Sequence, residues 1–331
     1  MISKMKGRDF ISFKDYTTEE IEQILSLASD LKRKHYTGEP HRLLEGKELG
    51  MLFFHASTRT RIAFETAMSH LGGHAQMYAA EHLHVFFWED WKDTAQVMSR
   101  YLDGIMMRLF YVPGRENEYG PARQVFRLMA DHANVPIINA QDDEEHPCQV
   151  MGDLLTYKEK FGQDFRKKKI AMIWCPCPKP ITAGIPHSLA IGGGKLGMNI
   201  VYAYPEGYDM DPAYIDEGRK LAEQNGGSIT ITHDYMEAAK DADVIYAKSW
   251  KNVLQPFDKA EWDKRHEELL DWRIEKKHFK VANPNCLFMN AMPITREIDA
   301  ANEIIDGPMS VLYDQAENRM HAQKAIMAMI M

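Results

Sequence analysis

The segment 57–61, Ser-Thr-Arg-Thr-Arg, combines hydroxyl side chains with two guanidinium groups in five consecutive residues. It follows a short apolar run, 50–54, that is typical of a buried strand, and it leads into a helical pattern over 60–70. Backbone N–H groups at the positive end of that helix, together with the two arginines, would bind a phosphate without a glycine-rich loop. A capped helix with surface arginines would account for the same residues, so this segment alone leaves both interpretations open.

A second segment, 146–149 (His-Pro-Cys-Gln), also lies between an expected strand and an expected helix. Histidine can donate to a carbonyl oxygen, and glutamine can both accept from and donate to an amide. His146 and Gln149 therefore suit a carbamoyl group better than a simple phosphate, although a structural histidine is the alternative. In a third segment, 314–321, Arg319 opens the last helix, and acidic capping would explain that segment without any function.

The elements that must position these residues alternate between strand and helix along the whole chain. At 331 residues the chain is about twice the usual length of one domain. A capping box that begins at Thr17 predicts a helix over 17–34. The repeated order of strand and helix predicts parallel strands with right-handed crossovers. The expected fold class is therefore α/β with two doubly wound parallel-sheet domains, 1–150 and 151–314.

Composition excludes several classes of protein. The net charge is −8, from 40 basic and 48 acidic residues, which disfavours nucleic acid as a partner. No apolar run approaches the roughly 20 residues of a membrane helix, and the first residues lack the pattern of a secretory signal. Four cysteines are too sparse for a disulfide framework in a chain of this size. These features predict a cytoplasmic protein with reduced thiols and no membrane association.

Two motifs point towards other functions but have the wrong context. The glycines of 192–197 match a G-x-G-x-x-G dinucleotide fingerprint, which would indicate an oxidoreductase. They follow an expected helix and precede an expected strand, whereas the fingerprint requires the reverse order. Cys175 and Cys177 form a C-x-C pair without a second pair, which is poor spacing for zinc. We therefore expect neither a dinucleotide nor a metal site.

Together, the three candidate segments resemble the aspartate/ornithine carbamoyltransferase family over nearly the whole chain. The resemblance implies transfer from carbamoyl phosphate to an amino-acid amine without any cofactor, in a cleft between the domains. It also implies that the C-terminal helix, 315–331, returns to the first domain. The residues expected to bind carbamoyl phosphate are Ser57, Thr58, Arg59, Thr60, Arg108, His146, Gln149, Arg319 and, through its backbone carbonyl, Met292. Thr60, Arg108 and His146 would also stabilise the negative charge that develops on the carbamoyl oxygen.

The acceptor is indicated by departures from the ornithine enzymes, which resemble one another in an Asp-x-Trp-x-Ser-Met-Gly segment. This chain has Tyr-Ala-Lys-Ser-Trp at 246–250, and Lys248 would repel an ammonium group. The segment resembles the knotted subgroup that carbamoylates N-acetylornithine or N-succinylornithine, as does 178–183. The resemblance implies a trefoil knot in the second domain and acceptor contacts from Asp142, Lys248 and Asn290. Asp142 and Lys248 could equally be solvated surface charges.

Two positions keep other acceptors open. Asn-Ala-Met-Pro at 290–293 stands where the family usually has His-Cys-Leu-Pro, and Asp299 stands where the acetylornithine type has a lysine. Ornithine, another diamine or diamino acid, or a non-catalytic binding role are therefore alternatives. The aromatic segment 86–92 would reach a neighbouring subunit of a homotrimer, where Trp88 would contact the phosphate, although interface packing explains it as well.

Overall fold

The computed structural model describes residues 4–179 and 181–331, and it divides the chain into two compact units. The first unit consists of Met1–Leu155 and Glu317–Met331, and the second unit is Thr156–Ala316. Helix α12 (Leu312–Ile330) therefore ends inside the first unit, which confirms the expected return of the C-terminal helix. The trefoil knot stays a prediction. Pro180, which belongs to the segment 178–183, lies outside the described residues.

The first unit is built on a four-stranded parallel sheet with the strand order β2-β1-β3-β4. The strands are β1 (Glu48–Phe53), β2 (His74–Ala79), β3 (Gly104–Arg108) and β4 (Ile137–Asn139). The α-helices are α1 (Thr18–Thr37), α2 (Thr58–His70), α3 (Trp91–Met98), α4 (Pro121–His132) and the first part of α5 (Pro147–Phe161). Three short 3-10 helices are η1 (Phe13–Asp15), η2 (Ala80–His82) and η3 (His84–Phe86). Crossover helices cover both faces of a parallel sheet, so β1 and β3 read as continuous apolar runs.

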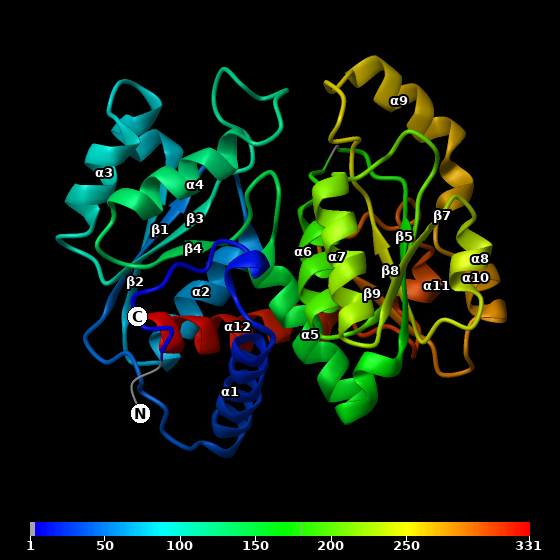
Figure 1. Ribbon diagram of the computed structural model, residues 1–331, viewed down its shortest axis with the longest axis horizontal. Coiled ribbons are helices and arrows are strands. Elements are labelled where there is room, and N and C mark those ends of the chain that lie inside the picture. Colours follow the sequence, from blue (N-terminus) through cyan, green and yellow to red (C-terminus); the bar gives the residue numbers. More distant parts are fainter. Residues whose placement is uncertain (1–3, 180) are drawn as a thin grey trace. The chain divides into compact units, whose positions relative to one another are not determined.

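Side chains of these strands alternate between the two faces of the sheet. Leu52, Ile105 and Met107 lie in one hydrophobic core with buried residues of α3 and α4. A Cβ atom on Gly104 would instead lie 3.1 Å from the sulfur of Met331, so the end of the chain packs against β3. Figure 1 shows α3 and α4 on one side of this sheet and α1, α2 and α12 on the other.

The second unit contains a five-stranded parallel sheet with the order β7-β6-β5-β8-β9. The strands are β5 (Lys169–Trp174), β6 (Asn199–Ala203), β7 (Ser228–Thr232), β8 (Val244–Lys248) and β9 (Leu287–Asn290). The helices are η4 (Gly162–Lys167), α6 (Gly184–Lys195), α7 (Pro212–Gln224), α8 (Tyr235–Ala239), α9 (Lys259–Glu268), η5 (Leu270–Trp272), α10 (Lys276–Val281) and α11 (Asn302–Ile305). In Figure 1, α6 and α7 cover one side of this sheet and α8, α10 and α11 the other. The two parallel sheets confirm the predicted α/β class.

Glycine allows α6 and α7 to pack closely. A Cβ atom on Gly194 would lie 2.6 Å from the carbonyl oxygen of Gly218 in α7, and one on Gly193 would lie 2.7 Å from the side chain of Ile200. Gly197 has a φ of 67°, which favours glycine, and it ends the helix. The G-x-G-x-x-G match at 192–197 is therefore explained by helix packing and a turn.

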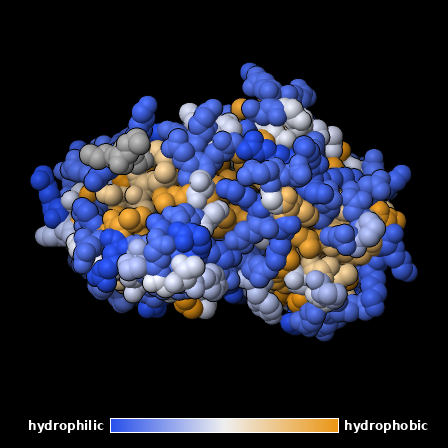
Figure 2. All heavy atoms as spheres, turned by 90° about the horizontal axis from the view of Figure 1, so that it is seen from below, coloured by the Kyte–Doolittle hydropathy of each residue, from blue (hydrophilic) through white to orange (hydrophobic). Residues whose placement is uncertain are grey.

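The surface in Figure 2 is mostly hydrophilic, with scattered hydrophobic areas. Within residues 4–179 and 181–331, no helix is long and apolar enough to cross a membrane. All four cysteines are buried free thiols.

Candidate functional site

Each sheet has a point at which the strand order reverses, and ligands of parallel sheets bind beyond the carboxyl ends of strands at such points. In the first unit the reversal lies between β1 and β3, which end at Phe53 and Arg108. In the second unit it lies between β5 and β8, which end at Trp174 and Lys248. The predicted segment 57–60 and Arg108 lie at the ends of β1 and β3, and Lys248 lies at the end of β8, so each unit carries a candidate subsite.

In the first unit, the segment after β1 opens helix α2. Ser57 occupies the N-cap position with extended backbone angles, but its side chain makes no capping hydrogen bond. Ser57 and Arg59 are half-buried, Thr58 is exposed, and Thr60 is only 1% exposed. The helix start thus presents backbone N–H groups that its own N-cap side chain does not satisfy, as an anion site at a helix N-terminus requires.

Arg319 joins this segment from the other end of the chain. Its Nη2 donates a hydrogen bond to Oγ1 of Thr60 over 2.7 Å. Arg319 is 4% exposed, and α5 passes close to it because a Cβ atom on Gly152 would lie 2.9 Å from Cγ and 3.0 Å from Cα of Arg319. The bond and the close helix packing fix the position of the Arg319 side chain.

Arg108, at the end of β3, faces two further guanidinium groups. Its pKa is lowered to about 9, first by burial and then by the charges of Arg319 and Arg59. Its Nη1 donates to the carbonyl oxygen of Ala140 over 3.3 Å. Three like charges around one place repel one another, so a bound dianion would stabilise all three. The structure thus brings together Arg59, Arg108, Arg319 and Thr60 as a site suited to phosphate.

The second predicted segment opens helix α5. His146 is 4% exposed and Gln149 is 2% exposed, and the backbone N–H of Gln149 donates to the carbonyl oxygen of His146 over 3.1 Å. Nε2 of Gln149 donates to Oδ1 of Asp153 over 2.9 Å, which fixes the orientation of its amide. Burial raises the pKa of Cys148 between them to about 12, so this thiol is not a nucleophile near neutral pH.

Asp142 is not a surface charge. It is fully buried and forms an ion pair with Nε of Arg123, and its Oδ2 also accepts a hydrogen bond from Nδ2 of Asn139 over 2.9 Å. Its Oδ1 accepts hydrogen bonds from the backbone N–H groups of Glu144 and Glu145, over 2.9 and 2.6 Å. Both carboxylate oxygens are thus used inside the first unit, and an acceptor contact for Asp142 stays a prediction without support from these bonds.

Trp88, like Thr58, is exposed, unlike the buried residues that are predicted to bind carbamoyl phosphate. Its side chain is 76% exposed, and its ring lies 5.3 Å from the ring of His84. The adjacent Phe87 is 68% exposed.

In the second unit, Lys248 ends β8 and is also buried, so the surface-charge alternative is wrong for it. Lys248 is 5% exposed, and its Nζ donates to the carbonyl oxygen of Ser249 over 3.0 Å. Two indoles hold this segment: Nε1 of Trp250 donates to the carbonyl oxygen of Tyr208 over 2.8 Å, and Nε1 of Trp174 donates to that of Trp250 over 2.9 Å.

Asn290 ends β9, the strand beside β8. Its backbone N–H donates to Oε1 of Gln315 over 3.1 Å, and Nε2 of Gln315 donates to the hydroxyl of Tyr246 over 3.1 Å. Asn290 is 3% exposed, whereas Met292, which precedes Pro293, is half-buried. The structure thus places Asn290 and Lys248 at the same edge of the second sheet.

Asp299 belongs with these residues, although the sequence marked it only as a departure from the family. It is 5% exposed, and its Oδ2 accepts a hydrogen bond from the backbone N–H of Thr295 over 3.1 Å. Burial raises the pKa of Asp299 to about 6, while Thr295, the charge of Lys248 and the side chain of Asn290 act in the opposite direction. The signal in the sequence was an acidic residue in place of a lysine, but its burial could not be read from it.

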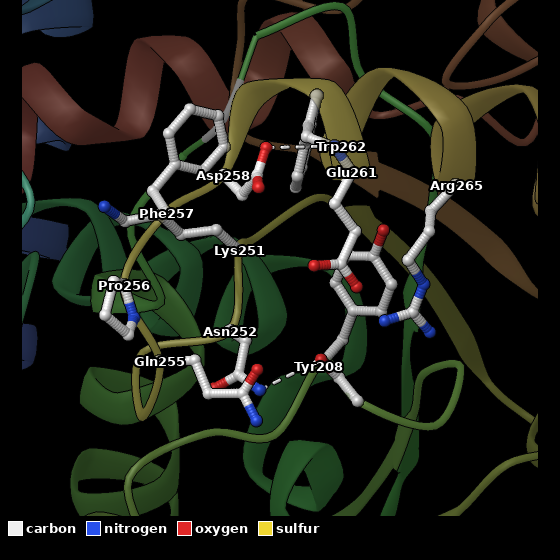
Figure 3. A pocket seen from close by; sticks show the side chains of 11 residues that line it. Tyr208, Lys251, Asn252, Gln255, Pro256, Phe257, Asp258, Glu261, Trp262 and Arg265 are labelled. Atoms are coloured by element: carbon white, nitrogen blue, oxygen red, sulfur yellow. Dashed lines mark hydrogen bonds between the residues drawn. The ribbon is translucent and has the colours of Figure 1, made fainter.

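The second unit also has a surface pocket, lined mainly by residues that follow Lys248 in the sequence. Figure 3 shows the side chains that line it. It is formed by Gly207, Tyr208 and residues of the segment 251–265. Nδ2 of Asn252 donates to the carbonyl oxygen of Gly207 over 3.0 Å, and the guanidinium of Arg265 lies 4.7 Å from the centre of the Tyr208 ring. None of the predicted site residues lines this pocket.

Metal ligands do not gather in the part of the chain that the structure describes, where no group of three or more His, Cys, Asp or Glu side chains could hold an ion.

Two family models match the chain and together cover nearly all of it. Residues 8–159 match the carbamoyl-P binding domain of aspartate/ornithine carbamoyltransferase, and residues 167–330 match the Asp/Orn binding domain of the same family.

Similar proteins extend over the full length. An ornithine carbamoyltransferase of Thermococcus kodakarensis is 40% identical, with 100% of this chain and 98% of the relative covered. The structure of ornithine carbamoyltransferase from Pyrococcus furiosus has a TM-score of 0.89 at 40% identity, with 100% and 99% covered. An acetylornithine transcarbamylase complexed with acetylcitrulline has a TM-score of 0.88 at 29% identity, with 97% and 98% covered.

Proposed function

The chain belongs to the aspartate/ornithine carbamoyltransferase family, and from this premise we propose that it transfers the carbamoyl group of carbamoyl phosphate to the side-chain amine of ornithine. Use of carbamoyl phosphate follows from the family. The choice of ornithine is supported by the full-length relatives at 40% identity, which are ornithine carbamoyltransferases, against 29% for the acetylornithine enzyme. The proposal replaces the N-acylated acceptor that the sequence favoured.

The observation that carries the donor assignment is the convergence of three guanidinium groups and one hydroxyl in the first unit. Arg108 is electrostatically coupled to Arg59 and Arg319, and Arg319 bonds Thr60 at the start of α2. We propose that these groups, with Ser57, bind the phosphate of carbamoyl phosphate. The buried His146 and Gln149 are proposed to bind its carbamoyl end, and the carbonyl oxygen of Met292 to accept from its amide.

The proposed reaction is a direct displacement at the carbamoyl carbon. The neutral amine attacks the carbamoyl carbon, and negative charge develops on the carbamoyl oxygen. The C–O bond to phosphate then breaks, and its electron pair leaves with the phosphate. Thr60, Arg108 and His146 are the proposed stabilisers of the carbamoyl oxygen, and one donor of this kind is typically worth about 3 kcal/mol. The amine loses one proton, which the departing phosphate takes up, and the products are a ureido amino acid and hydrogen phosphate. Positioning of two reactants can supply roughly 7–11 kcal/mol in favourable cases.

We propose further that the enzyme is a homotrimer in which the segment 86–92 reaches the site of a neighbouring subunit. Trp88 and Phe87 are 76% and 68% exposed in the single chain, and two adjacent exposed aromatic side chains are typical of an interface. A second subunit that covers them would explain both the exposure and the proposed phosphate contact of Trp88.

A second acceptor class is an N-acylated ornithine. It is favoured by one observation, the buried Lys248 in a Tyr-Ala-Lys-Ser-Trp segment that lacks the acidic residue of the ornithine enzymes. A lysine next to the acceptor would by itself favour an anion over an ammonium group.

A panel of amines tests the proposed function. Phosphate release is measured with carbamoyl phosphate and ornithine, N-acetylornithine, N-succinylornithine, aspartate or putrescine, with Arg59→Ala as the donor-site control. We expect the highest kcat/KM with ornithine and loss of carbamoyl phosphate binding in the control. A higher kcat/KM with an N-acylated ornithine would move the acceptor to the second class. No turnover with any amine, despite binding of carbamoyl phosphate, would leave a binding protein in place of an enzyme.

A further inference from the structure

We propose that the carboxylate of Asp299 binds the α-ammonium group of the acceptor, next to Lys248, which binds the α-carboxylate. This inference rests on the proposed function and narrows it to acceptors that keep a free α-amino group. Asp299 would then determine acceptor specificity. The chain lacks the aspartate of the Asp-x-Trp-x-Ser-Met-Gly segment, which holds the α-amino group in the ornithine enzymes, so another carboxylate must take that role.

The first support is the incomplete hydrogen bonding of a buried charge. Oδ2 of Asp299 accepts from the backbone N–H of Thr295, but Oδ1 is buried and makes no hydrogen bond of ordinary geometry among residues 4–179 and 181–331, although the side chains of Asn290 and Thr295 lie near enough to act on the carboxylate. A buried carboxylate oxygen without a donor destabilises the folded protein, and the cost is larger for a charged group than for a neutral one. A ligand with an ammonium group would supply the missing donor.

The second support is the position of Asp299 in the second unit. Lys248 and Asn290 end the adjacent parallel strands β8 and β9, in which Ala247 pairs with Asn290. Their side chains both act on the carboxylate of Asp299, so the three groups lie within electrostatic range of one another at the carboxyl edge of the sheet. The strand order reverses between β5 and β8 at this edge, which is where parallel sheets bind ligands.

The third support is charge complementarity. Lys248 and Asp299 are each 5% exposed, and the charge of Lys248 acts on the carboxylate of Asp299, so a positive and a negative side chain are buried in the same region of the second unit. An amino acid with free α-amino and α-carboxyl groups carries the same two charges, and it can pair with both. An N-acylated amino acid carries only the negative charge, and it would leave the carboxylate of Asp299 buried against a neutral amide.

The same pair answers the argument that Lys248 excludes an ammonium group. Lys248 by itself would repel an ammonium group, but the negative charge of Asp299 lies within electrostatic range of Lys248 and offsets that repulsion. Two thiols, Cys175 and Cys177, also face this carboxylate, and they are neutral at physiological pH because burial raises the pKa of each.

L-norvaline is the probe for this inference, because it has the backbone of ornithine and cannot react. Its affinity for the full-length protein in the presence of carbamoyl phosphate is measured by calorimetry and compared with that of N-acetyl-L-norvaline. The wild-type protein should bind L-norvaline at least about tenfold more tightly. In Asp299→Asn this preference should disappear, whereas it should persist in Asp306→Asn, which removes an exposed carboxylate of the same region.

A pH series on the wild-type protein gives a readout that needs no variant. The carboxylate of Asp299 must be ionised to bind an ammonium group, and its pKa is about 6 in the free protein. The affinity for L-norvaline should therefore fall as the pH is lowered from 7 to 5, with a smaller change for N-acetyl-L-norvaline.

The outcomes separate this inference from the proposed function. Equal or tighter binding of N-acetyl-L-norvaline by the wild-type protein, or unchanged L-norvaline affinity in Asp299→Asn, would overturn the role of Asp299, even if carbamoyl transfer is observed. Selective L-norvaline binding that depends on Asp299, without turnover of any amine, would support the subsite and overturn the proposed reaction.

Discussion

Nη2 of Arg319 donates a hydrogen bond to Oγ1 of Thr60 over 2.7 Å, and 259 residues separate the two in sequence. The bond orients an arginine of α12 against the start of α2 within the first unit. Thr60→Val, which keeps the shape of the side chain, should lower kcat by about a hundredfold, because it removes both a proposed donor and the partner of Arg319. Steady-state phosphate release measures this. Thr60→Ser keeps the hydroxyl and should retain most of the activity; an equal loss in both variants would contradict the role of the hydroxyl.

The charge of Arg108 should destabilise the free protein but strengthen the binding of an anion. Its charge is repelled by Arg319 and Arg59, so Arg108→Gln should leave the unfolding temperature of the free protein unchanged or higher. The same change should weaken the binding of inorganic phosphate, used as the probe of the donor site, by at least about tenfold, because a charge-assisted hydrogen bond is lost. Thermal unfolding with and without inorganic phosphate measures both effects.

The control for this prediction is Arg61→Gln. Arg61 belongs to the same segment, but it is exposed and its Nε donates to Oε1 of Glu65 over 3.0 Å. It should leave phosphate affinity unchanged. A large loss of unfolding temperature in Arg108→Gln without phosphate would show that Arg108 serves stability and not the anion.

Gly152→Ala should displace Arg319. The added Cβ atom would lie 2.9 Å from Cγ of Arg319 and 3.0 Å from its Cα, so one of the two helices must shift. Overpacking typically costs about 1–3 kcal/mol, and the higher helix propensity of alanine returns about 1 kcal/mol. We therefore expect a loss of stability of up to about 2 kcal/mol by urea unfolding, with a clear loss of carbamoyl phosphate affinity. Glu159→Ala, at an exposed position of α5, is the control and should change neither quantity.

A group of histidines in the first unit should make stability depend on pH. His321 is fully buried, and burial and the charge of Lys324 lower its pKa to about 3; the same causes lower that of His70 to about 4. The ring of His35 stacks on that of His70 at 4.6 Å. Below about pH 6.5 the unfolded chain binds protons that the folded state does not, so these histidines reduce stability as the pH falls from 7 towards 4.

Other groups act in the opposite direction, so the measured quantity must be a difference between variants. Burial raises the pKa of Asp143 to about 7, and this carboxyl adds stability as the pH falls. The free energy of unfolding of the wild type minus that of His70→Gln should therefore decrease between pH 7 and pH 5. A difference that does not vary with pH would contradict the prediction.

The sequence predicts the central strands of both sheets, but it misses two of the four edge strands. The expected helix 17–34 and the apolar run 50–54 correspond to α1 and β1, because a capping box marks the start of α1 and most residues of β1 are buried. Strands β2 and β9 were missed. Each lies at the edge of its sheet, β2 is mostly half-exposed, and β9 has only four residues. Strand β2 has few fully buried side chains, and β9 is apolar but short, so neither gives a long apolar run in the sequence.

In the candidate site, the burial and the partners of individual charged side chains could not be predicted from the sequence. The family resemblance identified Arg108, Thr60 and Arg319. Arg108 and Thr60 lie at a strand end and a helix start, whereas Arg319 lies inside α12 and does not open that helix as expected. The sequence could not show that Asp142 is paired with Arg123, or that Asp299 is buried within electrostatic range of Lys248. Burial and partners come from segments that are distant in sequence, and only the folded chain brings them together.

The three converging arginines of the first unit do not distinguish the phosphate of the donor from the phosphate that is released. Both are compact anions, and both relieve the same repulsion between Arg108, Arg59 and Arg319. Under the proposed function, product inhibition is therefore an inherent property of this enzyme. Progress curves should slow as phosphate accumulates, and the rate in a cell should depend on the ratio of carbamoyl phosphate to inorganic phosphate rather than on the donor concentration alone.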